Sequence, residues 1–392
     1  MSYNDEEELM KILYQSSLCT EEVLKNLYKD SDISPGIQAQ KYNKLIVEGM
    51  NLNNQEIFVL SALPVNRSIS KKFFVLKKSE IHNNIKYYYY PAINIPIVKD
   101  LFVLIFSFIK TASSLLLKKD SIVMCDLLSL PNSLGATLAA RVLRKDSIGI
   151  LTDLPEYVIS TKSKFFLKLY YWLINLQNKY VFLTKEMNEK INHHNKKNII
   201  IEGWCDIKRI NNNVKKKNYI LYSGNLNKNN GIQNLVAAFL EIQSQYQLII
   251  FGSGDYDSEL RKLTLENNNI TYYGFANNDI VLKYQEESRI LAIPRPLDEE
   301  FVKYSFPSKL IEYMQSGSAI ITTKLPGIPS EYDRYLYFFD SPDIIDLKQG
   351  LERLIARPEL ELDAKGLTAR DFIIKNKNNV IQAKKIIELI KE

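Results

Sequence analysis

The sequence has few of the residues that build metal sites or disulfide frameworks. It contains three cysteines, Cys19, Cys125 and Cys205, and three histidines among 392 residues. The cysteines are widely spaced and odd in number, which argues for a reducing compartment and against disulfides or structural zinc. The histidines, including the neighbours His193 and His194, lack the spacing of metal ligands. The sequence therefore predicts no metal centre built from these residues.

The sequence also lacks a signal peptide at its start and an uninterrupted apolar run. Residues 1–8 are acidic, which is incompatible with a secretory signal there. The longest apolar stretch, 101–117, is interrupted by Lys110, serines and a threonine, so we expect a buried or half-buried helix instead of a membrane span. A basic, aromatic stretch at 164–174 has a nearly helical period. It fits either a core-facing helix or one lying on a membrane.

The sequence has only a small excess of charge of one sign, and it is spread over the whole chain. The formal net charge is +6, and hydrophobic residues make up 46% of the chain. This composition is that of a globular protein with a sizeable core, and the length indicates two domains. The mild basic excess fits anionic small ligands or an anionic membrane surface. Because the charge is diffuse and no aromatic RNA-binding motif is present, we expect no nucleic-acid partner.

Short β-branched runs alternate with amphipathic segments along the whole chain, which predicts an α/β fold with parallel sheets. A polar, basic stretch at 208–218 interrupts the pattern and is typical of an interdomain linker. We therefore expect domains at 1–205 and 206–368, and a terminal segment at 369–392. The strands expected in the first half are 56–60, 86–90, 121–124, 148–151 and 180–184; those in the second are 219–223, 247–251, 270–273, 290–293 and 319–322.

Helices are expected between these strands. They span 37–50, 97–117, 133–143, 165–177, 232–244, 256–266, 277–287, 307–316 and 369–391. In open sheets of this kind, ligands bind outside the carboxyl ends of the strands. Polar or glycine-rich segments that follow a strand are therefore the candidates for a binding site.

Two such segments are rich in glycine and asparagine. In 221–232, a strand leads through Gly224 and Asn225 into a helix; in 251–255, a strand leads through Gly252 into the next helix. Open amides at a helix start, with glycine permitting close approach, bind anions. The same residues also make ordinary strand-to-helix turns. Neither segment has the spacing of a Walker loop or of a dinucleotide fingerprint.

The segment 294–317 is the most informative. Pro307 suits the first position of a helix and Gly317 its end. Ser308, Lys309 and Glu312 then share one face of the first turns, where a carboxylate can accept hydrogen bonds from a ribose diol and a cation can meet phosphate. A solvated helix with a Lys309–Glu312 ion pair is the plainer interpretation. The preceding loop carries further polar residues, Arg295, Glu299, Glu300 and Lys303.

Several of these motifs together resemble the family 4 glycosyltransferases, and the branch that builds bacterial surface polysaccharides in particular. The resembling segments are 222–226 with 231–232, 251–254, 273–275, 306–317 and 321–331. The first half resembles the family more thinly, at 36–38, 153–157, 183–187 and 201–203. The resemblance implies a GT-B fold, with two Rossmann-like domains facing across a cleft. It also implies a last helix that crosses back to the first domain.

The resemblance further implies a retaining hexosyltransferase that uses a nucleotide-diphosphate sugar and needs neither a metal nor another cofactor. Its acceptor is expected to be a glycan or a polyprenyl-linked glycan, as in capsule or exopolysaccharide synthesis. We expect a cytoplasmic protein, with peripheral contact at the inner membrane face. The C-terminal domain would bind the donor and the N-terminal domain the acceptor.

Carried over by position, Glu312 is expected to bind the ribose. The other acidic position of the family's pair falls at Tyr304, and the family's diphosphate-binding cations fall at Asn225 and Asn230. Glu300, Lys309 and Asp153 are the candidate catalytic residues. The residues expected to bind the donor are Gly36, Gly224, Asn225, Gly252, Gly274, Phe275, Arg295, Lys303, Ser305, Ser308, Lys309 and Glu312.

Two other functions fit the sequence. Loss of both usual cations is compatible with a non-catalytic glycosyltransferase-like partner subunit. A nucleotide-sugar epimerase shares the two-domain architecture, although no carboxylate and histidine set typical of one is present. Nucleotide binding separates the first alternative from an enzyme, and an epimerised sugar formed without acceptor would identify the second.

Overall fold

The fold was analysed in a computed structural model. It describes residues 10–29, 31, 37–70, 73–75, 79–118, 120–158, 163–208 and 214–392. The chain forms two compact units, and each is described by itself. Unit 1 contains Met1–Trp204 and Asn379–Glu392, and unit 2 contains Cys205–Asn378.

Unit 1 is built on a sheet with the strand order β10-β9-β8-β7-β1-β2-β5-β4, in which the β4–β5 pair alone is antiparallel. Its strands are β1 (Lys11–Ser16), β2 (Glu56–Ser61), β4 (Glu80–His82), β5 (Ile85–Tyr89), β7 (Ser121–Asp126), β8 (Ser147–Leu151), β9 (Lys179–Phe182) and β10 (Asn198–Ile200). The strands β3 (Phe74–Val75) and β6 (Ala92–Ile93) form a separate antiparallel pair.

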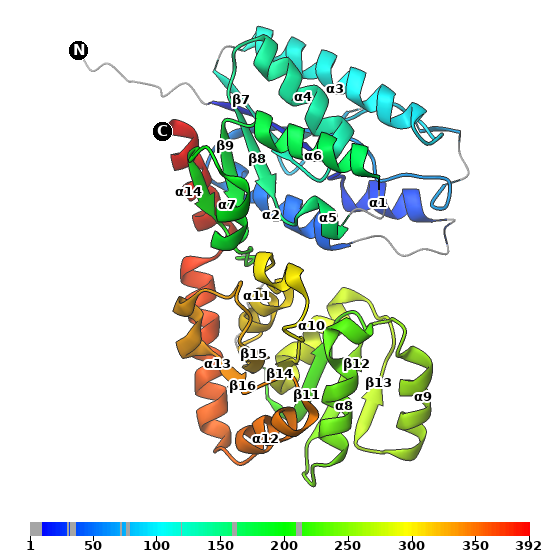
Figure 1. Cartoon of the computed structure of the whole chain (residues 1–392), viewed down its shortest axis with the longest axis vertical. Helices are drawn as coiled ribbons and strands as arrows, with labels where there is room; N and C mark the ends of the chain where they lie inside the picture. The colour runs from blue at the N-terminus through cyan, green and yellow to red at the C-terminus, as the bar shows by residue number, and fades with distance from the viewer. Residues whose placement is uncertain are drawn as a thin grey trace, which may run out of the picture. The chain divides into compact units, whose positions relative to one another are not determined.

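Helices cover both faces of this sheet (Figure 1). They are α1 (Glu21–Tyr28), α2 (Ile37–Leu52), α3 (Val98–Leu117), α4 (Leu130–Val142), α5 (Pro155–Val158), α6 (Lys164–Leu176), α7 (Lys185–Ile191) and α14 (Asn379–Lys391). On one face α3 and α6 both pack against α4, and on the other α2 packs against α14.

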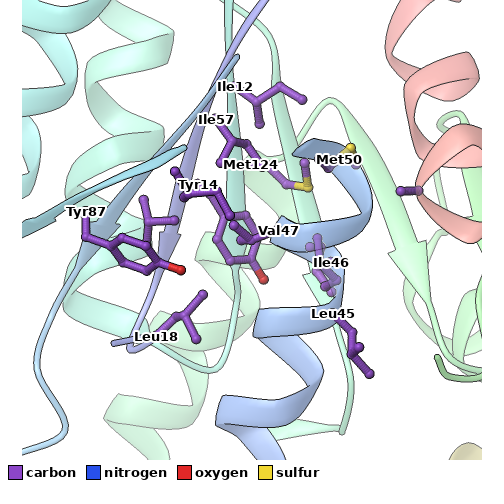
Figure 2. Close-up of a cluster of buried hydrophobic side chains, with 14 of the residues drawn as sticks. Ile12, Tyr14, Leu18, Leu45, Ile46, Val47, Met50, Ile57, Tyr87 and Met124 are labelled. Atoms are coloured by element: carbon purple, nitrogen blue, oxygen red, sulfur yellow. The ribbon is translucent and has the colours of Figure 1, made fainter. Parts of the chain in front are cut away.

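The core of unit 1 lies between the sheet and α2. Ile12 and Tyr14 of β1 are fully buried and meet Ile46 and Met50 of α2 in one hydrophobic cluster, shown with its neighbours in Figure 2. β1 occupies the centre of the sheet, yet the sequence pattern did not predict it. Its sequence KILYQS ends in two polar residues and shows no alternation, because a central parallel strand is buried on both faces.

Unit 2 contains a six-stranded, wholly parallel sheet with the order β13-β12-β11-β14-β15-β16. Its strands are β11 (Lys217–Ser223), β12 (Gln247–Phe251), β13 (Ile270–Tyr272), β14 (Ser288–Ile293), β15 (Ala319–Thr323) and β16 (Tyr337–Phe339). Its helices are η1 (Lys228–Asn230), α8 (Ile232–Leu240), α9 (Asp257–Glu266), α10 (Asn278–Glu287), η2 (Glu300–Tyr304), α11 (Ser308–Gln315), η3 (Ser330–Tyr335), α12 (Ile344–Ile355) and α13 (Glu359–Asn376).

The sequence predicted a single helix at 369–391. The structure has two helices there, α13 and α14, and Lys377 and Asn378 separate them. The amide of Cys205 donates a hydrogen bond of 2.9 Å to the carbonyl of Lys377, and Cys205 pairs with Asn378 in a parallel bridge. The break falls in the sequence 376–379, where asparagines and a lysine offer the backbone local hydrogen bonds in place of the helical ones. Helix α13 belongs to unit 2 and α14 to unit 1.

Helices α2 and α14 approach closely because α2 carries a glycine at the contact. A Cβ atom on Gly49 would lie 2.2 Å from the carbonyl oxygen of Asn379 and 2.9 Å from the Cβ of Ala383. Backbone atoms form the nearest contact, so the two helices would have to move apart to admit a side chain. This contact fixes α14 on the first unit.

We expect Gly49→Val to destabilise the protein by about 2 kcal/mol or more, because overpacking between two helix backbones is not relieved by a rotamer change. Chemical denaturation followed by circular dichroism measures this loss. Leu52→Val, on the same helix at a position that is 44% exposed, is the matched control and should change stability by less than about 0.5 kcal/mol. Equal losses in the two variants would contradict the packing described here.

Candidate functional site

The strand order of unit 2 reverses between β11 and β14. From β11 the chain builds outward through β12 and β13, and it then returns to add β14, β15 and β16 on the other side. The connections after β11 and β14 therefore leave the sheet in opposite directions, and in open α/β sheets this is the point where ligands bind. The carboxyl edge of these two strands is here called the crevice. Ser223 ends β11 and Ile293 ends β14, so the segments predicted from the sequence lie at this edge.

The glycines at this edge bring consecutive turns into backbone contact. Gly224 N–H donates 3.0 Å to the carbonyl of Phe251, and Gly252 N–H donates 2.9 Å to the carbonyl of Gly274. Gly252 has φ +138°, and a Cβ atom there would lie 1.8 Å from the carbonyl oxygen of Gly224. Gly224, Gly252 and Gly274, three of the residues expected to bind the donor, thus follow one another in a row of backbone contacts, here called the glycine row.

Gly231 makes a second close approach, on the other side of the crevice. It is the N-cap of α8 with φ +75°, and a Cβ atom there would lie 1.8 Å from the carbonyl oxygen of Pro294. No side chain caps this helix start, so its first amides remain available to an anion. Gly231 was part of the glycine-rich segment in the sequence, but its contact with the end of β14 is visible only in the fold.

The two asparagines that stand at the family's cation positions lie in the turn before α8. Asn225 is exposed, and its Oδ1 accepts a hydrogen bond of 2.8 Å from the amide of Asn227. Its carbonyl accepts 2.7 Å from the hydroxyl of Tyr222. Asn225 therefore shapes the turn, and Asn230 ends the short helix η1 just before Gly231.

Glu312 lies at the centre of a hydrogen-bonded chain that joins α11, α10 and β11. Its Oε1 accepts 2.7 Å from Lys309 Nζ and 2.8 Å from Gln285 Nε2. The Glu312 side chain is 10% exposed and that of Lys309 is 29% exposed. A carboxylate so far removed from water is held by these donors, whereas an ion pair on an open helix face contributes little.

Gln285 continues the chain to the end of β11. Its side chain is fully buried, and Nε2 also donates 3.1 Å to Ser223 Oγ. The Ser223 amide in turn donates 2.8 Å to the hydroxyl of Tyr313. Burial raises the pKa of Tyr313, so its hydroxyl stays protonated at neutral pH. Hydrogen bonds with the buried side chains of Gln285 and Tyr313 thus hold Glu312 and the end of β11 in place.

Sequence reasoning did not find Gln285, Ser223 or Tyr313. Gln285 is one polar residue among several in α10, and its position opposite Glu312 depends on how α10 and α11 pack together. Oε1 of Gln285 is buried and has no hydrogen-bond partner among the described residues. The side-chain amide is therefore oriented by Nε2, which donates to both Glu312 Oε1 and Ser223 Oγ.

Arg295 lies in the loop that follows β14. Burial is the main cause of the raised pKa of Tyr222, and the charge of Arg295 acts in the opposite direction. The guanidinium carbon also lies 4.7 Å from the ring centre of Phe301. The Thr323 hydroxyl donates 2.6 Å to the carbonyl of Arg295 and ties this loop to β15.

The remaining loop residues flank the start of α11. Glu300, Lys303 and Ser308 are exposed, and Ser305 is half-buried. The Oγ of Ser305 is shielded from solvent and has no hydrogen-bond partner among the described residues. The helix itself begins at Ser308, one residue later than expected, because Pro307 takes the extended conformation of an N-cap (φ −69°, ψ 100°).

Aromatic side chains line the adjoining end of the sheet, after β13. Phe251 and Tyr273 stack with ring centres 4.9 Å apart, and Tyr273 shares a hydrogen bond of 2.7 Å with the hydroxyl of Tyr284. That bond, with partial burial, raises the pKa of Tyr273 to about 12. Phe275, which follows Gly274 of the glycine row, is 62% exposed.

Two expected site residues are not in unit 2. Asp153 lies just after β8 in unit 1 and is half-buried. Gly36 falls outside the described residues, which resume at position 37 with the start of α2. The other expected residues lie in unit 2, and Asp153 and Gly36 stay separate predictions.

Comparison with known proteins gives this half of the chain a family. Residues 206–366 match the model of the family described as glycosyl transferases group 1. These residues form a group 1 glycosyltransferase domain. The domain contains the whole crevice, from Gly224 to Glu312. An uncharacterised glycosyltransferase of Methanocaldococcus jannaschii is 26% identical over 350 residues, which cover 80% of this chain and 86% of the relative.

Solved structures show the same fold over nearly the whole chain. Sucrose-phosphate synthase from Thermosynechococcus elongatus superposes with a TM-score of 0.67 at 14% identity, covering 97% of this chain and 98% of that one. HepE of Anabaena, solved in complex with UDP, gives 0.63 at 14% identity, covering 97% and 100%. The fold is therefore GT-B, as the resemblance implied, and the group 1 domain is its second Rossmann-like unit.

We expect Gly252→Ala to destabilise the protein by about 2 kcal/mol or more, because the new methyl group would overlap the Gly224 carbonyl and the backbone has a positive φ. Gly224→Ala is the matched control. There the nearest atom to a Cβ is the Tyr222 hydroxyl, at 3.2 Å, and the loss should be clearly smaller. Urea denaturation of both variants compares them. Equal losses would refute the backbone contact between the two turns.

Proposed function

We propose that this protein is a retaining glycosyltransferase of the hexosyltransferase type. It moves a sugar from a nucleoside diphosphate sugar to a glycan or a polyprenyl-linked glycan. The match of residues 206–366 to glycosyl transferases group 1 supports the reaction class. The observation that carries the proposal is the position of the Glu312 carboxylate on α11. It accepts hydrogen bonds from Lys309 of the same helix and from Gln285 of α10.

In this proposal the nucleotide lies along the crevice of unit 2. The ribose diol donates to the carboxylate of Glu312, and Phe275 and the backbone at 273–275 take the base. The diphosphate lies over the glycine turns, near the uncapped amides at the start of α8. HepE was solved with UDP, which makes uridine the first base to test.

Positive charge for the diphosphate must come from outside the usual positions, because Asn225 and Asn230 are neutral. Lys309 is the leading candidate, since its Nζ already lies beside the proposed ribose site. When the ribose takes hydrogen bonds to Glu312, the ammonium can turn to a phosphate oxygen and keep an anionic partner throughout. Arg295, Lys303 and Lys228 are the other cations on the same loops.

The chemical step breaks the bond between the anomeric carbon and the phosphate oxygen and forms a bond from the acceptor oxygen on the same face of the sugar. The proton of the acceptor hydroxyl passes to the leaving phosphate. The protein contributes position and charge stabilisation, which together supply the main part of catalysis in such transfers. Glu300 would contact sugar hydroxyls, and no resident metal or cofactor takes part in the proposal.

The acceptor is assigned to unit 1, with Asp153 orienting its hydroxyl and Gly36 approaching the phosphates. The resemblance of 321–331 to the bacterial enzymes of surface polysaccharide synthesis supports a role in capsule or exopolysaccharide assembly in the cytoplasm. This part of the proposal rests on sequence resemblance, whereas the donor site also rests on the geometry of unit 2.

Glu312→Ala and Lys309→Ala should each lower donor turnover by about a hundredfold or more, because each removes a charged contact to the bound donor. Release of nucleoside diphosphate from a panel of nucleotide sugars measures the rate. Lys348→Ala, which removes a surface ion pair with Glu241, is the matched control and should leave the rate unchanged. Wild-type rates in both site variants, with the fold intact, would sink the assignment.

Gln285→Met should raise the KM for the donor about tenfold while lowering kcat less, because the amide orients Glu312 without touching the reacting atoms. Steady-state kinetics separate the two constants. Lys283→Met changes an exposed position on the same helix and should alter neither. A Gln285 variant in which KM is unchanged would show that the amide has only a structural role.

Nucleotide titration by calorimetry distinguishes the proposal from its alternatives. The proposed enzyme binds a nucleoside diphosphate and releases it from a donor sugar. A non-catalytic partner that kept the fold without this site would bind none, and an epimerase would return the nucleotide sugar with an inverted centre. Either result would replace the proposed reaction.

A further inference from the structure

Helix α3 of unit 1 buries several small polar residues and exposes large aliphatic ones, whereas a surface helix of a water-soluble domain usually does the reverse. Its inward positions include the small polar residues Ser107, Thr111 and Ser114, which are buried. Its outward positions, together with the residue before the helix, are large and aliphatic. These residues, here called the α3 face, are Ile97, Val98, Leu101, Ile105, Ile109, Leu116 and Leu117, with exposures from 36% to 88%.

The inward side of α3 is fixed to the domain. A Cβ atom on Gly135 of α4 would lie 2.3 Å from the carbonyl of Leu104, so the two helix backbones are in contact. Ser107 Oγ donates 2.5 Å to the carbonyl of Asn132, and Gln15 Nε2 donates 3.0 Å to Thr111 Oγ1. The small polar residues therefore serve close packing and hydrogen bonding. Val103 and Leu115 are buried beside them, whereas the residues of the α3 face point outward.

Among the described helices, α3 is the one that is long and apolar enough to cross a membrane, judged by length and composition alone. The helix includes three residues before the stretch 101–117, which makes it longer than that apolar stretch, and it is partly buried, as expected. Crossing would require α3 to leave its hydrogen-bonded contacts with α4 and β1. Its packed position instead presents one apolar face, which is the arrangement of a helix that lies on an interface.

Helix α6 adds aromatic and basic residues on the same side of the sheet. α3 and α6 both pack against α4, and Figure 1 shows all three in the layer on that side of unit 1. Phe165 is 70% exposed and Trp172 is 46% exposed. Lys164 and Lys168 are exposed between them, and residues 164–177 contain no Asp or Glu. Aromatic rings and lysines together are typical of membrane-water interfaces.

We propose that the α3 face and the outer side of α6 form a surface that binds an anionic lipid membrane. Seven exposed aliphatic residues in and next to one helix mark a binding surface, since contiguous apolar patches on soluble proteins are commonly interaction sites. Burial of the α3 face in the acyl boundary supplies the apolar contribution, and Lys164 and Lys168 add attraction to anionic headgroups. The surface lies wholly in unit 1 and is independent of the nucleotide site.

Charge favours a lipid surface over a second copy of the chain. A two-fold dimer through this surface would bring the same patch of each copy together. Lys164 and Lys168 of both copies would then lie in one interface, where the one exposed acidic residue of α3 and α6 is Asp100, so the interface would carry an excess of positive charge. Against an anionic bilayer the same lysines are complementary.

Vesicle flotation with the full chain tests the proposal. The protein should float with phosphatidylcholine vesicles that contain phosphatidylglycerol, and about tenfold more weakly with phosphatidylcholine alone. The triple variant Leu101→Gln, Ile105→Gln and Ile109→Gln should lose at least about tenfold in binding, because three aliphatic contacts with lipid are replaced by polar ones. Absence of wild-type flotation with either vesicle would overturn the proposal.

Matched controls separate this loss from unfolding. The double variant Leu265→Gln and Leu360→Gln places the same polar side chain at two highly exposed positions of unit 2 and should float like the wild type. The substituted positions of α3 point outward, so the triple variant should keep the wild-type melting temperature. An unchanged affinity of the triple variant, or an equal loss in the control, would refute the assignment of the surface.

A charge-reversed variant and light scattering complete the test. Lys164→Glu with Lys168→Glu should abolish the preference for phosphatidylglycerol while leaving the weak binding to phosphatidylcholine. The wild type without lipid should scatter as a monomer at micromolar concentration. A wild-type dimer that the α3 triple variant converts to monomer, without any vesicle binding, would assign the surface to a second copy and contradict the proposal.

Discussion

Backbone contact at the carboxyl edge of unit 2 is the constraint on which the site depends. Gly252 lies against the carbonyl of Gly224, and Gly231 lies against the carbonyl of Pro294. A side chain at Gly252 or Gly231 would force the turns apart, and the crevice between β11 and β14 would change shape. Since glycines stand at both contacts, no Cβ atom separates the touching backbones, and the start of α8 has no side-chain cap and can meet a ligand.

The hydrogen-bonded chain from Lys309 to Ser223 connects this edge to the helices behind it. Glu312 is largely withdrawn from water, and such a carboxylate is stable only with its donors in place. Gln285 and Lys309 provide those donors from two helices. The same contacts orient the carboxylate before any ligand arrives, so binding need not order it.

Much of this arrangement could be predicted from the sequence, since strand and helix periodicity located most elements of unit 2. The glycines at 224, 252 and 274 follow strands, and parallel strands end at one edge, so their meeting was expected. Strand β1 was missed because a short segment buried on both faces lacks alternation. The break at Lys377 was missed because local asparagines were read as part of an otherwise continuous helical pattern.

The role of Gln285 was beyond sequence reasoning for a different reason. It depends on the packing of α10 against α11, two helices separated along the chain by β14 and the loop at 294–307. The same limit applied to α3, where composition described an apolar helix but only packing shows which side faces outward. Side-chain direction relative to neighbouring elements is therefore the information that the fold adds.

Hydrogen–deuterium exchange of the full chain, with and without UDP, tests the donor site most directly. The account predicts slower exchange of the amides at 224–232, 252–255, 273–275 and 308–312 when the nucleotide is bound, and no such protection in a Glu312→Ala variant. Nucleotide binding that leaves these amides unprotected, or that protects only segments of unit 1, would contradict the assignment of the crevice in unit 2.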